Sequence, residues 1–190
     1  GRAGTANFWI FVPLVFCSNQ ELAVIKDVLP RALGYQKSKR YERFTEGLVG
    51  RLREGGDAAE PLLNIDSFEE AENPLFPNVD GVRFLTHNLG CGNTPEDIDS
   101  LCALLASYIT HPNVAGASVI SLGCQKAELA QLQEQIAQRD PEGVQPVHYY
   151  DRQSWEGPQD MLEAMIQDAV VGLQKANDVT REAISVSELI

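Results

Sequence analysis

Short apolar runs alternate with longer amphipathic stretches along this chain. The apolar runs are rich in β-branched and aromatic residues, which predicts strands, and the stretches between them place apolar residues every three or four positions, which predicts helices. The predicted strands cover residues 7–16, 82–86, 114–122 and 144–150. The predicted helices cover residues 20–33, 39–54, 95–111 and 159–176, with a further helix around residues 129–136.

Capping and breaking residues mark several helix boundaries. Thr94 is followed by Pro95 and, three residues after the cap, by Asp97, which is a strong helix start. Pro30 should end or kink the first helix. Strands separated by helices of this length imply right-handed crossovers and a parallel sheet covered on both faces. The predicted fold class is therefore α/β, a Rossmann-like three-layer α/β sandwich with a mostly parallel sheet, whose strand order the pattern does not reveal.

The chain is expected to be one domain, residues 1–190, cut from a longer polypeptide. Residues 55–78 hold three prolines and an acidic run, and we expect a long loop or insertion there. The chain opens without Met or a capping element, and residues 186–190 read like the start of another strand. Residues 178–190 are therefore expected to link this domain to a further C-terminal domain.

Composition and charge exclude several classes of partner. The formal net charge of −12 argues against a nucleic-acid or anionic-membrane surface. The most apolar stretch, Phe8 to Cys17, is about ten residues long, whereas a membrane-spanning helix needs about 20. Four cysteines in 190 residues do not amount to a disulfide scaffold, so we expect a cytoplasmic protein in a reducing environment.

Three of the four cysteines follow predicted strands, namely Cys17, Cys91 and Cys124. Ligands of parallel α/β sheets bind in the crevice outside the carboxyl ends of the strands, so these positions predict a site. Cys91 and Cys124 share a strand–Gly–Cys–helix setting, which favours a joint role as metal ligands or nucleophiles. Cys17 is equally explained by packing at a strand end, and Cys102, on the apolar stripe of a helix, is expected in the core.

Polar residues beside the cysteine loops complete the candidate site. His87 ends its strand at the same edge and is a candidate general base or metal ligand, although a histidine at a strand end is as often structural. His111 should lie at the opposite end of the sheet and His148 within a strand, so both are expected to be structural. The candidate substrate-binding residues are Asn88, Asn93, Thr94 and Gln125.

Several common site motifs are missing from the sequence. No glycine fingerprint follows the first strand, which leaves dinucleotide binding unsupported. There is no Gly-x-Ser-x-Gly elbow, Walker loop or His-Glu-x-x-His helix. The site cysteines are not in Cys-x-x-Cys pairs, which argues against a zinc ribbon or a thioredoxin-type centre.

Several blocks of the sequence are distinctive enough to carry a family resemblance. They are Gly1–Trp9, Val12–Cys17, Thr86–Gly92, His111–Gly116 and Ser121–Gln125. In these blocks the chain resembles the altronate/galactarate dehydratase family of sugar-acid hydro-lyases, over nearly its whole length and least in residues 55–78. Asn93 departs from the pattern, which has a second glycine after Gly92, and this puts the loop backbone and its substrate contacts in doubt.

The resemblance implies a reaction and a domain arrangement. The reaction is elimination of water from altronate, or from a related hexonate or hexarate, to give a 2-keto-3-deoxy sugar acid. It is expected to depend on iron, as a ferrous ion or an iron–sulfur cluster. This chain would be the central domain, between N- and C-terminal domains of the same polypeptide, and the isolated domain would be nearly inactive. A homodimer is one arrangement to expect.

Roles for individual residues follow from the same resemblance. Cys91 and Cys124 would supply iron or cluster ligands, and a cysteine beyond Ile190 would complete the set, so the iron site of this chain alone would be absent or incomplete. His87 would be the base or an extra ligand. Three cysteines with one open iron position would suit a hydro-lyase cluster.

Two other functions remain open at this point. A sulfo-acid lyase of the same architecture would expel sulfite from a sulfonated hydroxy acid, whereas a dehydratase forms a keto acid from altronate. Alternatively, the domain is a non-catalytic scaffold or dimerisation unit, and the chemistry resides in a C-terminal domain.

Overall fold

A four-stranded parallel sheet forms the centre of the molecule. The computed structural model describes residues 3–36, 40–59, 73–125 and 127–188. All three strand pairings are parallel, and the strand order is β2-β1-β3-β4. The strands are β1 (Phe8–Pro13), β2 (Gly81–Phe84), β3 (Val114–Ser121) and β4 (Val147–Asp151).

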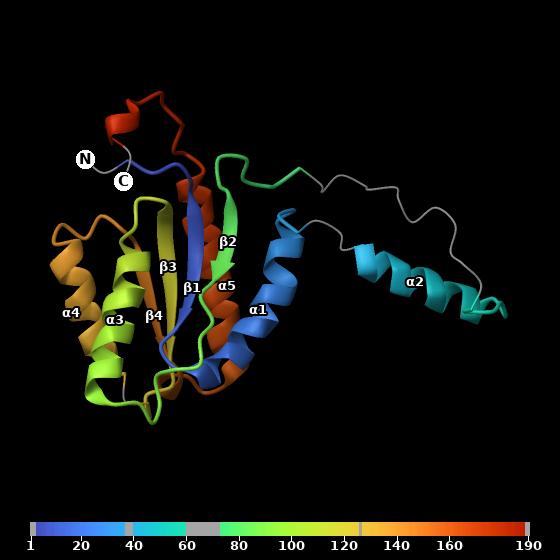
Figure 1. The fold of residues 1–190 in the computed structure, drawn as a ribbon, viewed down its shortest axis with the longest axis horizontal. Coiled ribbons are helices and arrows are strands. Elements are labelled where there is room, and N and C mark those ends of the chain that lie inside the picture. The colour runs from blue at the N-terminus through green and yellow to red at the C-terminus, as the bar shows by residue number, and fades with distance from the viewer. Residues whose placement is uncertain (1–2, 37–39, 60–72, 126, 189–190) are drawn as a thin grey trace.

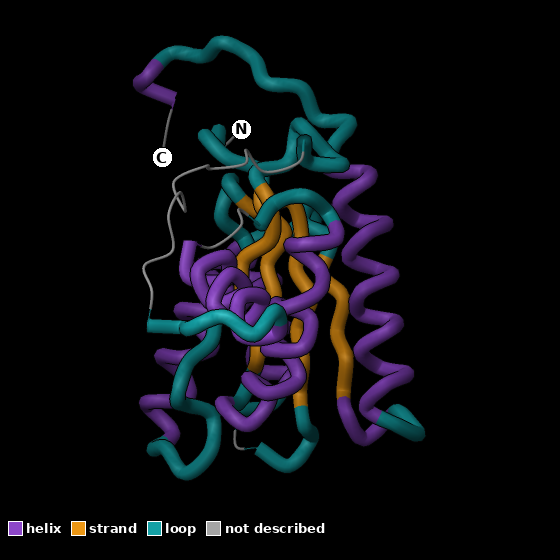
Figure 2. The backbone as a smooth tube through the Cα atoms, turned by 90° about the vertical axis from the view of Figure 1, so that its right-hand side faces the viewer, coloured by secondary structure: helices purple, strands orange, loops and turns teal. Residues whose placement is uncertain are grey.

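Helices cover both faces of this sheet (Figures 1 and 2). The five α-helices of the described chain are α1 (Asn19–Ala32), α2 (Arg40–Arg53), α3 (Pro95–Ile109), α4 (Leu129–Arg139) and α5 (Pro158–Ala176), and all but α2 pack on the sheet. α1 and α5 pack on one face, and α3 and α4 on the other. The predicted three-layer α/β sandwich is confirmed. α2 lies outside the layers, beyond α1 (Figure 1).

The central strand β1 contributes to both core layers through the alternation of its side chains. Trp9 and Phe11 are fully buried on the side of α1 and α5, in a cluster with Met165. Ile10 and Val12 are buried on the side of α3 and α4. A strand that is apolar on both faces is typical of a parallel sheet with helices on each side.

Trp9 fills the space between three strands and α5. Its indole Nε1 donates to Ser118 Oγ at 3.1 Å, and its ring centroid lies 5.8 Å from that of His148 on β4. Gly116 of β3 and Gly172 of α5 both face the ring, and a β-carbon at either position would collide with it. The two glycines therefore let β3 and α5 approach the indole closely.

The polar groups beneath α5 form a connected set. The Tyr150 hydroxyl donates to Asp168 Oδ2 at 2.7 Å, and His148 Nδ1 lies 3.8 Å from the same oxygen. Burial raises the pKa of Tyr150, and the hydrogen bond to Asp168 and its charge raise it further. The neutral phenol is thus retained as a donor inside the core. His148 packs on Trp9 within its strand, as predicted, and also pairs with a carboxylate.

Several predicted boundaries differ from the structure by a few residues, β4 for example starting at Val147 rather than Val144. β1 ends at Pro13 rather than Phe16, because Phe16–Ser18 form a short 3₁₀ turn that leads into α1. α1 continues past Pro30 to Ala32, with the Leu33 amide still donating to the Leu29 carbonyl.

The prediction that a strand starts at residue 186 is wrong, because Val186–Glu188 form a 3₁₀ turn. There the Ser187 amide donates to Ser185 Oγ at 3.3 Å, a local bond that competes with extended backbone. Of the long loop expected at residues 55–78, residues 60–72 lie outside the described part, and the remainder forms turns and bends.

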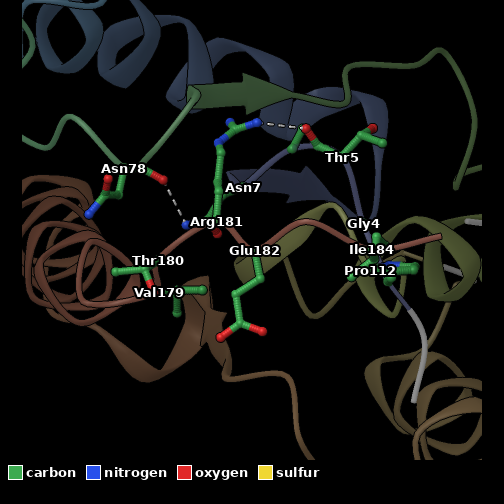
Figure 3. Close-up of a pocket in the computed structure, with 12 residues that line it drawn as sticks. Gly4, Thr5, Asn7, Asn78, Pro112, Val179, Thr180, Arg181, Glu182 and Ile184 are labelled. Carbon is green, nitrogen blue, oxygen red and sulfur yellow. Dashed lines mark hydrogen bonds between the residues drawn. The ribbon is translucent and has the colours of Figure 1, made fainter. Parts of the chain in front are cut away.

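The amino-terminal edge of the sheet joins the first and last described segments (Figure 3). Asn7 Nδ2 donates to the Asn78 carbonyl at 3.1 Å, and Asp80 Oδ2 accepts from the Asn7 amide at 2.6 Å. Arg181 forms a two-pronged ion pair with Asp80, both contacts at 2.8 Å, and donates to the Thr5 carbonyl at 3.1 Å. Beside this network lies a cavity of about 550 Å³.

None of the helices in the described residues combines the length and the apolar character needed to cross a bilayer.

The packing around Trp9 can be tested with a glycine substitution in α5. We expect Gly172→Ala to lower the free energy of unfolding by about 1–3 kcal/mol, because the added methyl group meets a buried ring that has no room to move. Urea denaturation followed by tryptophan fluorescence measures the change.

Gly50→Ala in α2 is the matched control, since no atom lies within 4 Å of the added β-carbon. It should leave the unfolding of the sheet unchanged, although alanine favours the helix by up to about 1 kcal/mol. Equal stability of the two variants would contradict the close approach of α5 to Trp9.

Candidate functional site

The carboxyl ends of β1 and β3 form the point at which the strand order reverses. After β1 the chain forms β2, which pairs with one side of β1, and then β3, which pairs with the other side of β1. Helices that follow these two strands lie on opposite faces of the sheet, which separates the loops after β1 and β3. Ligands of open α/β sheets bind at such a reversal of strand order. Cys17, Cys91 and Cys124 follow strands at this same edge of the sheet, as predicted.

The loop after β2, residues 85–94, crosses this edge and contacts the ends of both central strands. The Phe16 amide donates to the Leu89 carbonyl at 2.9 Å, and the Ala127 amide lies 3.5 Å from the Gly90 carbonyl. Gly90 has φ of +100° and packs directly on the backbone just after β1, where an added β-carbon would lie only 2.7 Å from Val15 Cα. Both its conformation and its contact require glycine. The three loops thus form one surface.

His87 holds this loop against the end of β1. Its Nδ1 accepts a hydrogen bond from the Leu89 amide at 3.1 Å, and its Nε2 lies 2.7 Å from the Pro13 carbonyl oxygen. Since a carbonyl only accepts, Nε2 carries the proton and the ring is the neutral Nε2–H tautomer. The His87 carbonyl in turn accepts from Asn19 Nδ2 at 2.8 Å. A role of His87 as general base stays a prediction. In that role, a ring nitrogen would have to give up one of these hydrogen bonds and contact the substrate instead.

The loop after β3 is organised by its own polar side chains. Gln125 Oε1 accepts from the Leu122 amide at 3.1 Å, and Gln125 Nε2 donates to Ser121 Oγ at 2.6 Å. The Ser121 hydroxyl also accepts from the Gly123 amide at 3.2 Å. Both ends of the Gln125 side chain are therefore used within the loop.

Asn93 and Thr94 also stabilise the backbone around them. Asn93 Oδ1 accepts from the Gly90 amide at 3.0 Å. Thr94 caps α3 in a reciprocal capping box with Asp97, which confirms the predicted helix start. Asn88 is exposed at the crest of the loop. Their role in substrate binding stays a prediction, and the structure places all of the candidates on neighbouring loops of one edge.

The four cysteines differ in accessibility. Cys17, Cys91 and Cys124 are free and exposed, whereas Cys102 is free and completely buried between α3 and the sheet, as expected for a core residue. Burial raises the pKa of the Cys102 thiol to about 11, with a further contribution from Asp99. Cys102 is therefore an unreactive thiol, and the three exposed cysteines remain candidates for chemistry.

An iron site would need more ligands than this edge supplies. Within the described residues, no three His, Cys, Asp or Glu side chains converge as a metal-binding group. A hydro-lyase cluster of the kind implied by the resemblance uses three thiolates. The described part of the chain therefore does not form a complete iron site, and Cys91 and Cys124 could provide only part of one.

A cavity of about 540 Å³ opens beside the loop after β3. Gln131 of α4 bonds to Asp99 of α3 across it, which joins the two helices. With Asp99 and Glu128 in its wall, the cavity favours hydroxyl and amide donors over carboxylates. It is lined by Pro95, Ile98, Asp99, Gln125, Glu128 and Gln131.

The sequence reasoning missed three polar residues at this edge. Ser121, the last residue of β3, is 2% exposed and accepts the bonds that order the next loop. Asp151 ends β4 and lies close to Gly123. Ser18, fully buried at the start of α1, has no hydrogen-bond partner for its hydroxyl. The strand-end argument applied to cysteines would have found Ser121 and Asp151, whereas nothing in the pattern marks Ser18.

His111 lies at the opposite edge, as predicted. Its Nδ1 accepts from the Asn113 amide at 3.1 Å, just beyond the end of α3. Asn113 Oδ1 in turn accepts from the amide of Thr5 at 2.7 Å. His111 thus belongs to the turn that anchors the N-terminal segment.

Comparisons with known proteins place the chain in a family. Residues 1–177 match the family described as D-galactarate dehydratase/Altronate hydrolase, second domain. The altronate dehydratase of Escherichia coli (strain K12) is 34% identical over 66 residues, which are 35% of this chain and 13% of that protein. The altronate dehydratase of Bacillus subtilis (strain 168) is 37% identical over 57 residues, 30% of this chain and 12% of that protein. No solved structure gives a significant match.

The accessibility of the cysteines predicts an ordered reaction with thiol reagents. Under native, reducing-agent-free conditions at mildly alkaline pH, Cys17, Cys91 and Cys124 should be alkylated, and Cys102 should react only after unfolding, because burial keeps it as the neutral thiol. Peptide mass spectrometry after timed alkylation identifies each site. Alkylation of Cys102 at the rate of the others would contradict the burial of this residue.

The bonds of His87 predict that its loss loosens the loop. We expect His87→Ala to destabilise the protein by about 1–2 kcal/mol and to speed hydrogen exchange at the Leu89 and Phe16 amides, because two backbone contacts lose their partner. The exposed neighbour provides the control, and Asn88→Ala should leave this exchange unchanged. Unaltered exchange in His87→Ala would show that the ring does not hold the loop.

Proposed function

Because the chain belongs to the D-galactarate dehydratase/altronate hydrolase family, as its second domain, we propose that it forms part of a sugar-acid dehydratase. The reaction eliminates water from altronate, or from a related hexonate or hexarate, and yields a 2-keto-3-deoxy sugar acid. The family match over residues 1–177 carries the proposal. The segments matched in the two altronate dehydratases cover only 13% and 12% of those proteins, so the activity belongs to a larger polypeptide.

The chemistry needs a base and a way to release hydroxide. A proton is removed from the carbon next to the carboxylate, and the β-hydroxyl leaves, which is unfavourable without help at the leaving oxygen. The carboxyl edge supplies exposed polar groups on three joined loops. Of these, His87 Nδ1 is the atom that accepts a proton when it exchanges the Leu89 amide for substrate.

Iron, if the enzyme uses it, would act as a Lewis acid on the departing hydroxyl. We propose that the exposed thiolates of Cys91 and Cys124 contribute to its binding. Because the described residues do not complete a ligand set, no step of the reaction is assigned to the metal. The missing ligands would come from outside this domain.

A flanking domain that completes the site would have to span the sheet. Segment 3–7 and the tail that begins at Asn177 lie at the amino-terminal edge, where Arg181 contacts Thr5 and Asp80. β3 is eight residues long, so the cysteine edge is about 26 Å away along the strand. A domain that continues this tail would therefore have to extend about 26 Å along the sandwich to reach the cysteines.

The proposal is tested in a polypeptide that joins this chain to the other domains of its family. Prepared without oxygen, it should form a keto acid from altronate. Cys91→Ser and Cys124→Ser should each lower both bound iron and turnover at least ~10-fold, because a hydroxyl is a poor replacement for a thiolate ligand. Keto-acid release and iron content are the two measurements.

Cys17→Ser is the control, since Cys17 is also exposed at this edge. It should retain iron and turnover close to those of the unsubstituted protein. Unchanged iron and turnover in both Cys91→Ser and Cys124→Ser would refute the ligand assignment. Sulfite release from a sulfonated hydroxy acid, without keto-acid formation from altronate, would refute the dehydratase. The 190-residue chain alone should be nearly inactive, and robust turnover by it would contradict a shared site.

A further inference from the structure

Four segments of the chain meet at the amino-terminal edge of the sheet (Figure 3). They are residues 3–7, the turn before β2 at residues 78–80, the end of α5 and the tail of residues 178–188. Asn7 Nδ2 joins the first three, since it donates to the Asn78 carbonyl at 3.1 Å and to the Ala176 carbonyl at 3.0 Å. Asn78 Nδ2 in turn donates to the Asn177 carbonyl at 2.8 Å. These three segments therefore form one hydrogen-bonded unit.

The tail is tied to this unit through Arg181 (Figure 3). Its Nη2 lies 2.8 Å from each carboxylate oxygen of Asp80, and its Nη1 donates to the Thr5 carbonyl at 3.1 Å. Among residues 180–188, no other residue forms a hydrogen bond with another part of the described chain. Apolar packing adds little there, since Val186 is 82% exposed. The tail is thus held at one point.

Asp80 connects this point to the sheet. Its Oδ2 accepts from the Asn7 amide at 2.6 Å, and its own amide donates to the Asn7 carbonyl at 2.8 Å. The next residue begins β2, which leads into the loop of His87 and Cys91 at the opposite edge. The Asp80 side chain is 32% exposed and that of Arg181 is 63% exposed, so the pair is partly shielded from water and stronger than a fully exposed one.

The two ends of the described chain are where the rest of a longer polypeptide would be attached. The chain matches a second domain, and the segments matched in its two relatives are 13% and 12% of those proteins. Residues 179–185 form neither helix nor strand, so without the ion pair the tail would be a flexible linker. With the ion pair, Thr5 at one end and Arg181 at the other have a fixed relation to the sheet.

We propose that Arg181 is a positioning residue of the complete enzyme. Its ion pair with Asp80 is a clamp that holds the tail across the amino-terminal edge, and it thereby sets where a domain attached to the tail meets the carboxyl edge. Arg181 acts through the tail, because the cysteine edge lies about 26 Å away along β3. The inference rests on the proposed function, since it concerns the part of the polypeptide that completes the proposed site.

Proteolysis of the 190-residue chain tests whether the ion pair holds the tail. A glutamate-specific protease cleaves after Glu182 when the tail detaches, so the rate of cleavage reports the detached fraction. Asp80→Asn removes the charge and leaves the tail sequence unchanged, and it should speed this cleavage about 3–10-fold. Arg181→Gln should have a similar effect, and the double variant should add little to either, because both substitutions remove the same contact. Mass spectrometry of the fragments measures the rates.

Arg31→Gln is the matched control. The Arg31 side chain is 62% exposed, close to the 63% of Arg181, and it forms an ion pair with Asp27 at 3.5 Å inside α1. The substitution removes the same charge from an exposed pair elsewhere, so cleavage after Glu182 should not change. Arg181→Lys should lie between the unsubstituted chain and Arg181→Gln, since an ammonium keeps the charge but lacks the planar fork of donors. Unchanged cleavage in both Asp80→Asn and Arg181→Gln would overturn the clamp.

Turnover of the polypeptide that joins this chain to the other domains tests the positioning role. Arg181→Gln should raise the KM for altronate about 3–10-fold and change kcat little, because substrate binds only the fraction of molecules in which the site is assembled. Arg31→Gln should change neither constant, and Arg181→Lys should raise the KM less than Arg181→Gln does. Circular dichroism establishes that each variant is folded.

Two results would overturn the positioning role. Faster cleavage after Glu182 together with an unchanged KM would show that the clamp holds the tail without placing the domain attached to it. Equal effects of Arg181→Gln and Arg31→Gln on turnover would trace the change to charge alone. Failure of the unsubstituted longer polypeptide to form a keto acid would instead refute the proposed function and with it the positioning role, whereas the cleavage rates would still decide the clamp.

Discussion

The burial of Trp9 sets the distances between the central strands and the helix above them. One indole contacts β3 through Gly116, α5 through Gly172 and β4 through His148, and its only polar atom is paired with Ser118. Large side chains at the two glycine positions would force these elements apart. The spacing of β1 from β3 and from α5 depends on this close packing.

The candidate site uses most of its polar side chains to hold its own loops. His87, Asn93 and Gln125 each bond to backbone atoms of the loops after β1, β2 and β3. Such bonds fix the loop backbones before any ligand arrives, which is the arrangement that favours precise positioning of reacting groups. The thiols of Cys91 and Cys124 are free and exposed on these loops. The loops of this edge are thus tied together by hydrogen bonds between side chains and backbone.

The two ends of the sandwich have different tasks. The amino-terminal edge is closed by the ion pair of Arg181 with Asp80 and by the bonds of Asn7, which join the first and last described segments. The carboxyl edge holds the cysteine loops, and α2 extends from the side. The cysteine loops, the terminal segments and α2 therefore lie on separate parts of the domain's surface (Figure 1).

The sequence by itself determined most of the elements, their alternation and the edge of the sheet at which Cys17, Cys91 and Cys124 lie. The spacing of apolar residues and the capping residues were enough for this, because the cap at Thr94 and the apolar runs of the strands are visible within short stretches of sequence. Only the tertiary structure decided the strand order and the use of each site residue. His87 reads as a base in sequence, yet its bonds to Pro13 and Leu89 depend on a loop that crosses two strands. Contacts between residues distant in sequence leave no local pattern, so the fold alone reveals them.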